Sequence, residues 1–209
     1  MKIDWRLLAI VITLTLIGIV RSSAAAADKP AAASDPNTLA SPKSFASIAD
    51  PQKRSAAYFT ELSKVLTHQR CVNCHPSGES PRQGDSRRLH QPLVVRGVDG
   101  YGRENMRCGT CHTNANFDQG RIPGNPHWHL APAEMAWEGK TPAEICRQIK
   151  DPKRNGNRSL NDLIDHIGKD ALVGWAWNPG YGRKPAPGTQ QQAGELVEAW
   201  AKSGAACPQ

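Results

Sequence analysis

The sequence predicts a mainly α-helical fold with extensive irregular loops, and three observations support this prediction. Four segments carry apolar residues at helical spacing, one near residue 60 and three in the last third of the chain. Residues 76–132 are instead rich in Gly, Pro, Asn and Arg and show little apolar periodicity. No segment shows the clear alternation of apolar and polar residues that is typical of a half-buried strand.

The N-terminal residues have the pattern of an export signal. Lys2 and Arg6 precede an apolar run, Leu7–Val20, which small residues follow. The run is short, because a membrane-spanning helix needs about 20 residues. We therefore expect a signal peptide at 1–26 and a periplasmic protein, which stays anchored to the membrane only if the signal is not cleaved.

The rest of the chain divides by composition. Residues 27–54 are rich in Ala, Pro and Ser, which predicts a flexible leader. The folded domain is expected at 55–209, with an irregular part at 55–137 and a helical C-terminal part at 138–209. Cleavage of the signal lowers the formal net charge from +7 to 23 − 18 = +5. The basic residues form no stripe with interleaved aromatic side chains, so nucleic acid is not an expected partner.

The first and last helices are predicted from apolar spacing alone. Tyr58–Leu66 carries such a stripe, and the helix is expected to run directly into Cys71. Near the C-terminus a similar stripe covers Ala193–Trp200, and Gly204 follows it as a stop signal.

The two helices between them are also marked by caps. Thr141 precedes Pro142 and Glu144, as an N-cap residue does in a capping box. Ser159 caps the next apolar stripe, which Gly168 is expected to end.

Two C-x-x-C-H motifs stand in the irregular part: a first motif, Cys71–His75 (CVNCH), and a second motif, Cys108–His112 (CGTCH). In such a motif the two thiols join the vinyl groups of a haem as thioethers, and the histidine becomes an axial ligand of the iron. The sequence therefore predicts two covalently attached haem c groups. The expected attachment residues and proximal iron ligands are Cys71, Cys74, His75, Cys108, Cys111 and His112.

The two motifs lie too close together for separate domains. Only 37 residues separate corresponding positions, so both haems are expected to share one compact shell. Residues 76–132 alone offer too little apolar surface to fold, and a haem supplies a large apolar object around which they can pack. The predicted architecture is a mainly α-helical chain wrapped around two haems, with residues 55–137 as the haem-binding part.

Two other interpretations of the motifs stay open. Zinc could bind the four cysteines as thiolates, or the pairs could be redox-active disulfides. Neither interpretation explains why a histidine directly follows each cysteine pair. The zinc site also needs reduced thiolates in an exported protein. The two remaining cysteines, Cys146 and Cys207, are expected to form a disulfide in an oxidising compartment.

An internal repeat suggests the distal ligands. A shift of 37 residues carries the first motif onto the second and His90 onto His127. We therefore expect His75 and His90 on one iron and His112 and His127 on the other. His129 is the alternative to His127, and exchange of the distal ligands between the two irons stays open. The other candidates, interpreted as surface or packing residues, are His68, His166, Met106 and Met135.

The stretch from Met106 to Pro132 and the following "EMAWEGKTPAEIC" resemble small bacterial dihaem proteins. Some of these are named as cytochrome subunits of isoquinoline 1-oxidoreductase-like molybdenum hydroxylases. The resemblance implies electron transfer and covers most of the chain from about Ser55. The chain departs from the pattern of single-haem cytochrome c domains. Each of those is a unit of about a hundred residues, with a methionine ligand far downstream of the motif.

These features predict an electron carrier and not an enzyme. The chain has enough histidines to supply both axial ligands of each iron, as an electron carrier requires. The expected partners are a dehydrogenase donor and a cytochrome or oxidase acceptor. The enzymatic alternative is a small dihaem peroxidase-like oxidoreductase with one open iron. A redox or gas sensor is a third interpretation, which no attached signalling domain supports.

Overall fold

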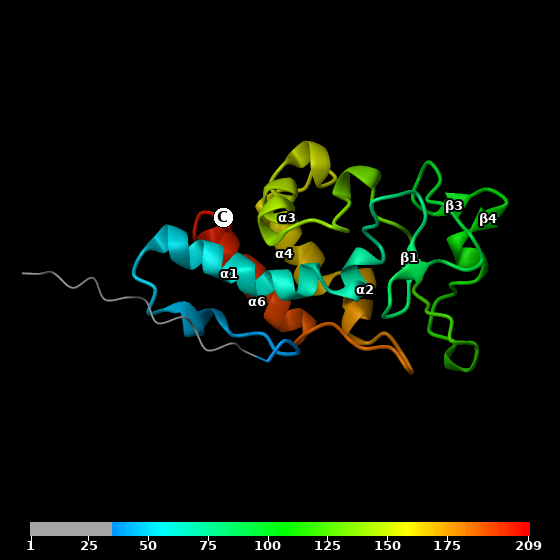
Figure 1. Cartoon of the computed structure of the whole chain (residues 1–209), viewed down its shortest axis with the longest axis horizontal. Coiled ribbons are helices and arrows are strands. Elements are labelled where there is room, and N and C mark those ends of the chain that lie inside the picture. Colours follow the sequence, from blue (N-terminus) through cyan, green and yellow to red (C-terminus); the bar gives the residue numbers. More distant parts are fainter. Residues whose placement is uncertain (1–34) are drawn as a thin grey trace, which may run out of the picture. The chain divides into compact units, whose positions relative to one another are not determined.

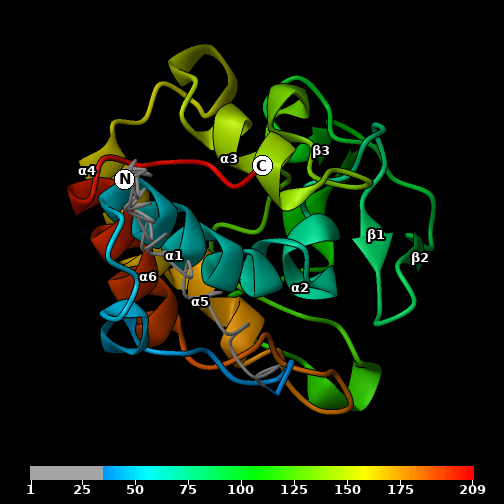
Figure 2. The same cartoon turned by 60° about the vertical axis from the view of Figure 1, so that its left-hand side comes forward.

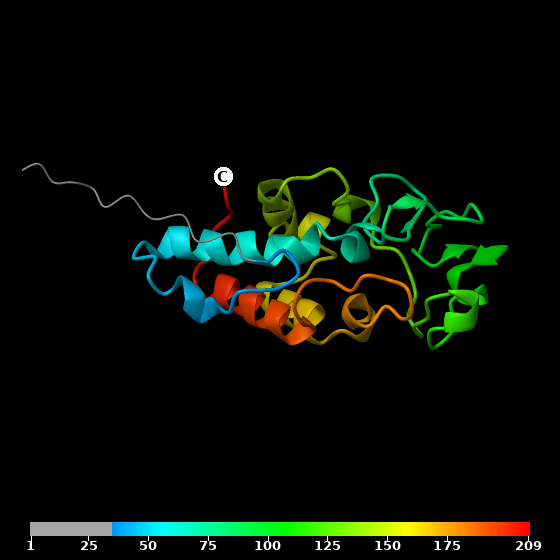
Figure 3. The ribbon, with the colours of Figure 1, turned by 60° about the horizontal axis from the view of Figure 1, so that its bottom comes forward.

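Two helices, α1 (Pro51–Leu66) and α6 (Gln190–Lys202), lie side by side in the computed structural model, which describes residues 35–209 (Figure 1). Figure 3 shows the same pairing from another side. Helix α4 (Leu160–Lys169) packs against α6, and α3 (Pro142–Ile149) packs against α1. The expected signal peptide at 1–26 lies outside the described residues.

Helix α4 continues beyond the expected stop. Ser159 and Thr141 form the predicted capping boxes of α4 and α3, with Asp162 and Glu144 as their partners. Gly168, however, lies inside α4. A Cβ atom at Gly168 would come within 3.0 Å of the Gly194 backbone on α6, so this glycine serves the close approach of two helices.

The core lies between these helices. Phe59 of α1 and Trp200 of α6 are fully buried, with ring centroids 5.0 Å apart. The predicted disulfide between Cys146 and Cys207 is confirmed and ties α3 to the segment after α6. Leu163 and Ile167 of α4 complete this apolar cluster.

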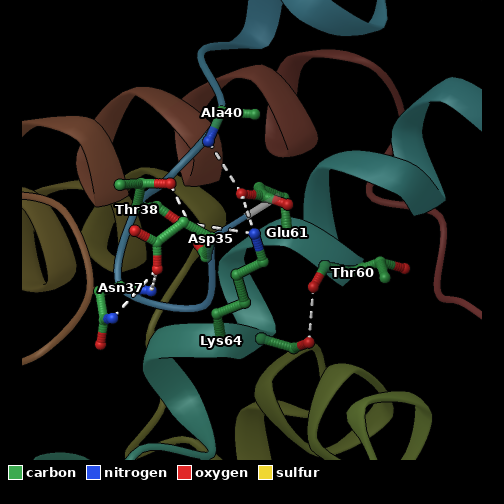
Figure 4. Close-up of polar contacts among 8 residues, drawn as sticks. Asp35, Asn37, Thr38, Ala40, Thr60, Glu61 and Lys64 are labelled. Carbon is green, nitrogen blue, oxygen red and sulfur yellow. Dashed lines mark hydrogen bonds and ion pairs between the residues drawn. The ribbon is translucent and has the colours of Figure 1, made fainter. Parts of the chain in front are cut away.

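Ordered structure begins earlier than the expected boundary at Ser55. Leu39 is buried in the core, and the backbone N–H of Ala40 donates to Oε1 of Glu61 at 2.8 Å (Figure 4). Lys64 forms an ion pair with the same carboxylate at 2.7 Å. The Ala/Pro/Ser-rich composition concealed this docking, because it depends on a few scattered apolar residues: Leu39 lies in the core, and Phe45 packs edge to face on Tyr58 of α1 (Pro51–Leu66).

Short elements make up the rest of the described chain. The helix before the first motif is broken at Thr67, so Cys71 lies on a separate short helix, α2. Two hairpins of two-residue strands lie beyond α2, and Figures 1 and 2 both place them away from the start of α1. The short helices and strands are α2 (Gln69–Val72), α5 (Ala171–Gly174), η1 (Pro42–Phe45), η2 (Cys108–Thr110), η3 (Asp118–Gly120), η4 (Ala133–Met135), η5 (Pro152–Arg154), η6 (Trp175–Trp177), β1 (Arg82–Gln83), β2 (Arg88–Leu89), β3 (Gly102–Arg103) and β4 (Met106–Arg107).

The fold is therefore mainly helical with extensive loops, as the sequence predicts. Within residues 35–209, no helix has the length and apolar character needed to cross a bilayer.

Candidate functional site

The two C-x-x-C-H motifs adopt the same backbone turn. His75 N–H donates to the carbonyl of Cys71 at 3.1 Å, and His112 N–H donates to the carbonyl of Cys108 at 2.9 Å. Positions i, i+3 and i+4 share one face of a helical turn, so each motif gathers its two cysteines and its histidine on one side. The repeat read from the sequence thus extends to local structure.

His68 is the N-cap of α2, the short helix on which the first motif begins. Its Nδ1 accepts a hydrogen bond from the backbone N–H of Arg70 at 3.3 Å, which caps α2. Burial, together with the nearby charge of Arg70, lowers the pKa of His68 to about 4, so the ring is neutral at pH 7 and its Nδ1 is free to accept.

The two motif histidines are held by equivalent hydrogen bonds. Nδ1 of His75 donates to the carbonyl of Met135 at 2.7 Å, and Nδ1 of His112 donates to the carbonyl of Pro123 at 2.8 Å. Burial lowers the pKa of both rings, that of His75 to about 4. Each ring is therefore neutral and presents Nε2. This is the arrangement of metal-binding histidines, whose other nitrogen usually donates to a carbonyl or carboxylate.

A tryptophan also stacks on each motif histidine. Trp137 covers His75 with ring centroids 3.6 Å apart, and Trp128 covers His112 at 4.7 Å. Trp175 meets Trp128 edge to face at 4.9 Å. The imidazoles are thus fixed both by a hydrogen bond and by a ring face, which leaves them little freedom to turn.

The two motifs line two adjoining cavities. The first cavity, of about 170 Å³, is bordered by the first motif and by Trp137, and the second cavity, of about 720 Å³, is bordered by the second motif. The second lies within the size range of cofactor pockets. The two cavities share walls, and the residues that line both are Arg70, Cys74, Trp128, His129 and Trp175.

The second cavity has a positive lining. Among the described residues on its wall there are six arginines and no Asp or Glu: Arg70, Arg82, Arg88, Arg107, Arg121 and Arg183. Three of them pair with carboxylates outside the cavity, whereas Arg88, Arg121 and Arg183 have no ion pair within residues 35–209. A cavity lined in this way favours an anionic occupant.

The other candidate histidines differ in which cavity they line. His90 lines the second cavity, where its ring centroid lies 5.9 Å from that of His112. His129 lines both cavities, and its Nδ1 donates to the carbonyl of His127 at 2.5 Å. His127 is exposed and lines neither of the two. The structure thus brings together His90 with His112, and His129 with both motifs.

Some residues of the site were missed at the sequence level. His166 borders the first cavity with Nδ1 3.7 Å from a carboxylate oxygen of Asp170, whereas its position beside an apolar stripe indicated helix surface. Arg70 is only 4% exposed and borders both cavities, although nothing in the sequence distinguishes it from the loop arginines. Its Nε is buried without a hydrogen-bond partner among the described residues.

The four motif cysteines are free thiols, and burial lowers the acidity of three of them. Burial raises the pKa of Cys71 to about 12 and that of Cys74 to about 11, and it also raises the pKa of Cys108. Redox-active C-x-x-C pairs depend on a depressed thiol pKa. The first motif therefore lacks the electrostatic setting of a redox-active dithiol.

Within residues 35–209, no group of three or more His, Cys, Asp or Glu side chains is placed to hold a metal ion. A four-thiolate zinc site calls for such a group, whereas a haem iron takes only two ligands from the protein. Comparison with known proteins finds no matching family model, no similar curated protein and no similar solved structure.

Proposed function

We propose that this chain is a periplasmic dihaem c-type cytochrome that carries single electrons between a dehydrogenase and a respiratory acceptor. One observation carries the proposal. Each motif histidine is a neutral ring with Nδ1 on a backbone carbonyl and Nε2 left for another ligand, at a cavity that the cysteines of the same motif also line. Two thiols and one such imidazole are what covalent haem attachment requires.

The polar groups around the cavities suit a haem. Its two propionates are anionic hydrogen-bond acceptors, and the second cavity offers arginines without carboxylates. Nε of Arg70 and Nε1 of Trp137 are buried donors without a partner among the described residues, and both residues border the first cavity. An acceptor that enters the cavities would satisfy donors that otherwise cost free energy to bury.

A bound haem would supply reversible one-electron chemistry at its iron. The residues of this chain would anchor it, orient the axial imidazoles and close the iron against other ligands. His75 and His112 would bind on the proximal side, and His90 and His129 are the histidines placed at the cavities for the distal side. An iron with two fixed imidazole ligands exchanges electrons without a change of ligands, which suits a carrier.

The surface near the second cavity suits an acidic redox partner. Arg88 and Arg121 border this cavity, are exposed and have no ion pair within residues 35–209. Complementary charge mainly raises the rate of encounter and depends on ionic strength. We expect the donor or the acceptor to present carboxylates to this surface.

A peroxidase-like oxidoreductase is the second candidate, and the pair of His166 and Asp170 favours it. The two side chains border the cavity of His75, and a carboxylate beside an imidazole is a common acid–base arrangement. This function requires that the iron bound by His75 has no distal protein ligand. The two candidates therefore differ in the coordination of the first iron.

An absorption spectrum of the haem-loaded full chain tests the proposal. Low-spin bands in the oxidised and reduced states, with no shift on addition of carbon monoxide, are expected for two closed irons and an electron carrier. A high-spin component, a carbon monoxide shift and turnover of hydrogen peroxide would instead support the oxidoreductase. His127→Ala is the matched control, because this exposed histidine borders neither cavity and its loss should leave the spectrum unchanged.

A further inference from the structure

We infer that the two repeats exchange their distal ligands: His90, which follows the first motif, binds the iron held by the second motif, and His129, which follows the second, binds the iron held by the first. The inference rests on the proposed haem attachment. It differs from ligation in sequence order, in which His90 would serve the iron of His75.

The hairpin after the first motif carries His90 toward the second motif. The chain leaves the first motif with Arg82 N–H donating to the carbonyl of Asn73 at 3.0 Å, and then forms the β1–β2 hairpin. At the end of the hairpin, His90 N–H donates to the carbonyl of Pro81 at 3.1 Å. These backbone bonds fix the position of His90, which lines the second cavity and is absent from the wall of the first.

The His90 ring makes the same kind of hydrogen bond as the rings of the motif histidines. Its Nδ1 donates to the carbonyl of Pro92 at 2.8 Å, which leaves Nε2 for another ligand. The centroids of His90 and His112 lie 5.9 Å apart. Two imidazoles that bind one iron from opposite sides have centroids on the order of 6 Å apart, since each metal–nitrogen bond is about 2 Å. The spacing of these two rings therefore suits one shared iron.

His129 is the histidine left for the first iron. It borders the first cavity together with His75, and its Nδ1 donates to the carbonyl of His127, so its Nε2 is also left for another ligand. Its competitor in that cavity, His166, has Nδ1 directed at Asp170 across 3.7 Å and not at a backbone carbonyl. Crossed ligation would interlock the two repeats, because each iron would then hold residues from both.

Variants with a single haem separate crossed from sequential ligation. In the full chain, Cys108→Ser/Cys111→Ser leaves the first haem, and Cys71→Ser/Cys74→Ser leaves the second. Crossed ligation predicts that adding His90→Ala leaves the first haem low-spin and insensitive to carbon monoxide. The same change should make the second haem high-spin and able to bind one carbon monoxide. The opposite result, or no effect on either haem, would overturn the inference.

A second set of variants tests the same inference if the chains with a single haem cannot be produced. His90→Ala/His112→Ala in the chain with all cysteines keeps one low-spin haem if both residues bind the same iron, and keeps none if they bind different irons. His129→Ala should open the first haem and His166→Ala should not; the reverse result overturns the assignment of His129. Failure of the proposed function is distinct, because the wild-type chain would then carry no covalent haem in its mass spectrum.

Discussion

The imidazole of His75 and the indole of Trp137 lie face to face, with ring centroids 3.6 Å apart and planes 3° from parallel. The contact is braced by the backbone, since Trp137 N–H donates to the carbonyl of His75 at 2.9 Å. Together with the bond from Nδ1 of His75 to Met135, the stack restricts rotation of the ring about its own bonds. Trp137 therefore positions the His75 ring, which under the proposed haem attachment would be the ligand of the first iron.

Replacing Trp137 should show this positioning role. Trp137→Leu removes the ring face, so the orientation of His75 should spread and the low-spin electron paramagnetic resonance signal of the first haem should broaden. Trp137→Phe keeps a ring face and should retain a narrow signal. Loss of the buried indole should also lower the free energy of unfolding by about 3 kcal/mol. A signal equally narrow in both variants would show that the stack contributes packing alone.

Arg70 should raise the reduction potentials of both centres. It is buried on the wall shared by the two cavities, and its guanidinium lies 5.9 Å from the centroid of Trp175. Its positive charge stabilises the reduced iron, which carries one positive charge less. Arg70→Met should lower both midpoint potentials by an amount on the order of tens of millivolts, the effect of a unit charge about 10 Å away at a dielectric constant of about 20.

Potentiometric titration of the haem-loaded protein measures this effect. Arg147→Met is the matched control, because Arg147 is exposed on α3 and borders neither cavity. Its loss removes the same charge from the chain and should leave both potentials near the wild-type values. Equal shifts in the two variants would mean that net charge, and not the position of Arg70, sets the potentials.

The helical C-terminal part was predictable because its signals are local. The capping boxes at Thr141 and Ser159 lie within four residues of the helix starts that they define, and the structure has both. The end of α4 was missed because Gly168 serves a contact with Gly194, which is distant in sequence. The docking of Leu39 in the core was missed for the same reason.

The candidate site was predictable only in part. The spacing within each motif fixes which cysteines and histidine share one turn, and the structure shows the same turn twice. The sequence could not reveal which loop histidine reaches which cavity, because that depends on the path of the β1–β2 hairpin. Arg70 gave no signal for a comparable reason, since its role follows from burial between elements that are distant in sequence.

The disulfide between Cys146 and Cys207 should contribute strongly to stability. It closes a loop with a sequence separation of 61 residues, for which the chain-entropy model gives about 4 kcal/mol. Other contacts also hold the C-terminal segment, since Lys150 donates to the carbonyl of Ala205 at 2.7 Å and Trp200 Nε1 donates to that of Ala206 at 2.9 Å. These contacts should keep the fold in place when the disulfide is removed.

Urea unfolding of Cys146→Ala/Cys207→Ala tests this expectation. The variant should lose about 4 kcal/mol of unfolding free energy. Reduction of the wild-type disulfide under native conditions should produce a comparable loss. The haem spectrum should not change, because Cys146 and Cys207 line neither cavity. A loss below about 1 kcal/mol would contradict this expectation and would mean that the unfolded chain without the disulfide retains structure.

The half-buried N-cap His68 should make stability depend on pH. Burial lowers its pKa in the folded chain to about 4, whereas an unfolded histidine has a pKa of about 6.5. Between these values the unfolded chain binds a proton that the folded chain does not. Stability should therefore fall as the pH decreases from 6.5 to 4, with no contribution from His68 to the slope above or below that window.

His68→Asn separates this titration from the cap itself. Asparagine is a strong N-cap residue, so its side-chain oxygen can accept from the N–H of Arg70 without titrating. The urea midpoint of the haem-loaded variant should fall less between pH 6.5 and 4 than that of the wild type. The pH dependence that remains would come from other groups such as His166, whose pKa is also lowered by burial. His127→Asn removes an exposed imidazole and should keep the wild-type pH profile. If the profile of His68→Asn matched that of His127→Asn, the neutral ring of His68 would not be the source of the acid sensitivity, and the cap of α2 would have to tolerate a charged imidazole.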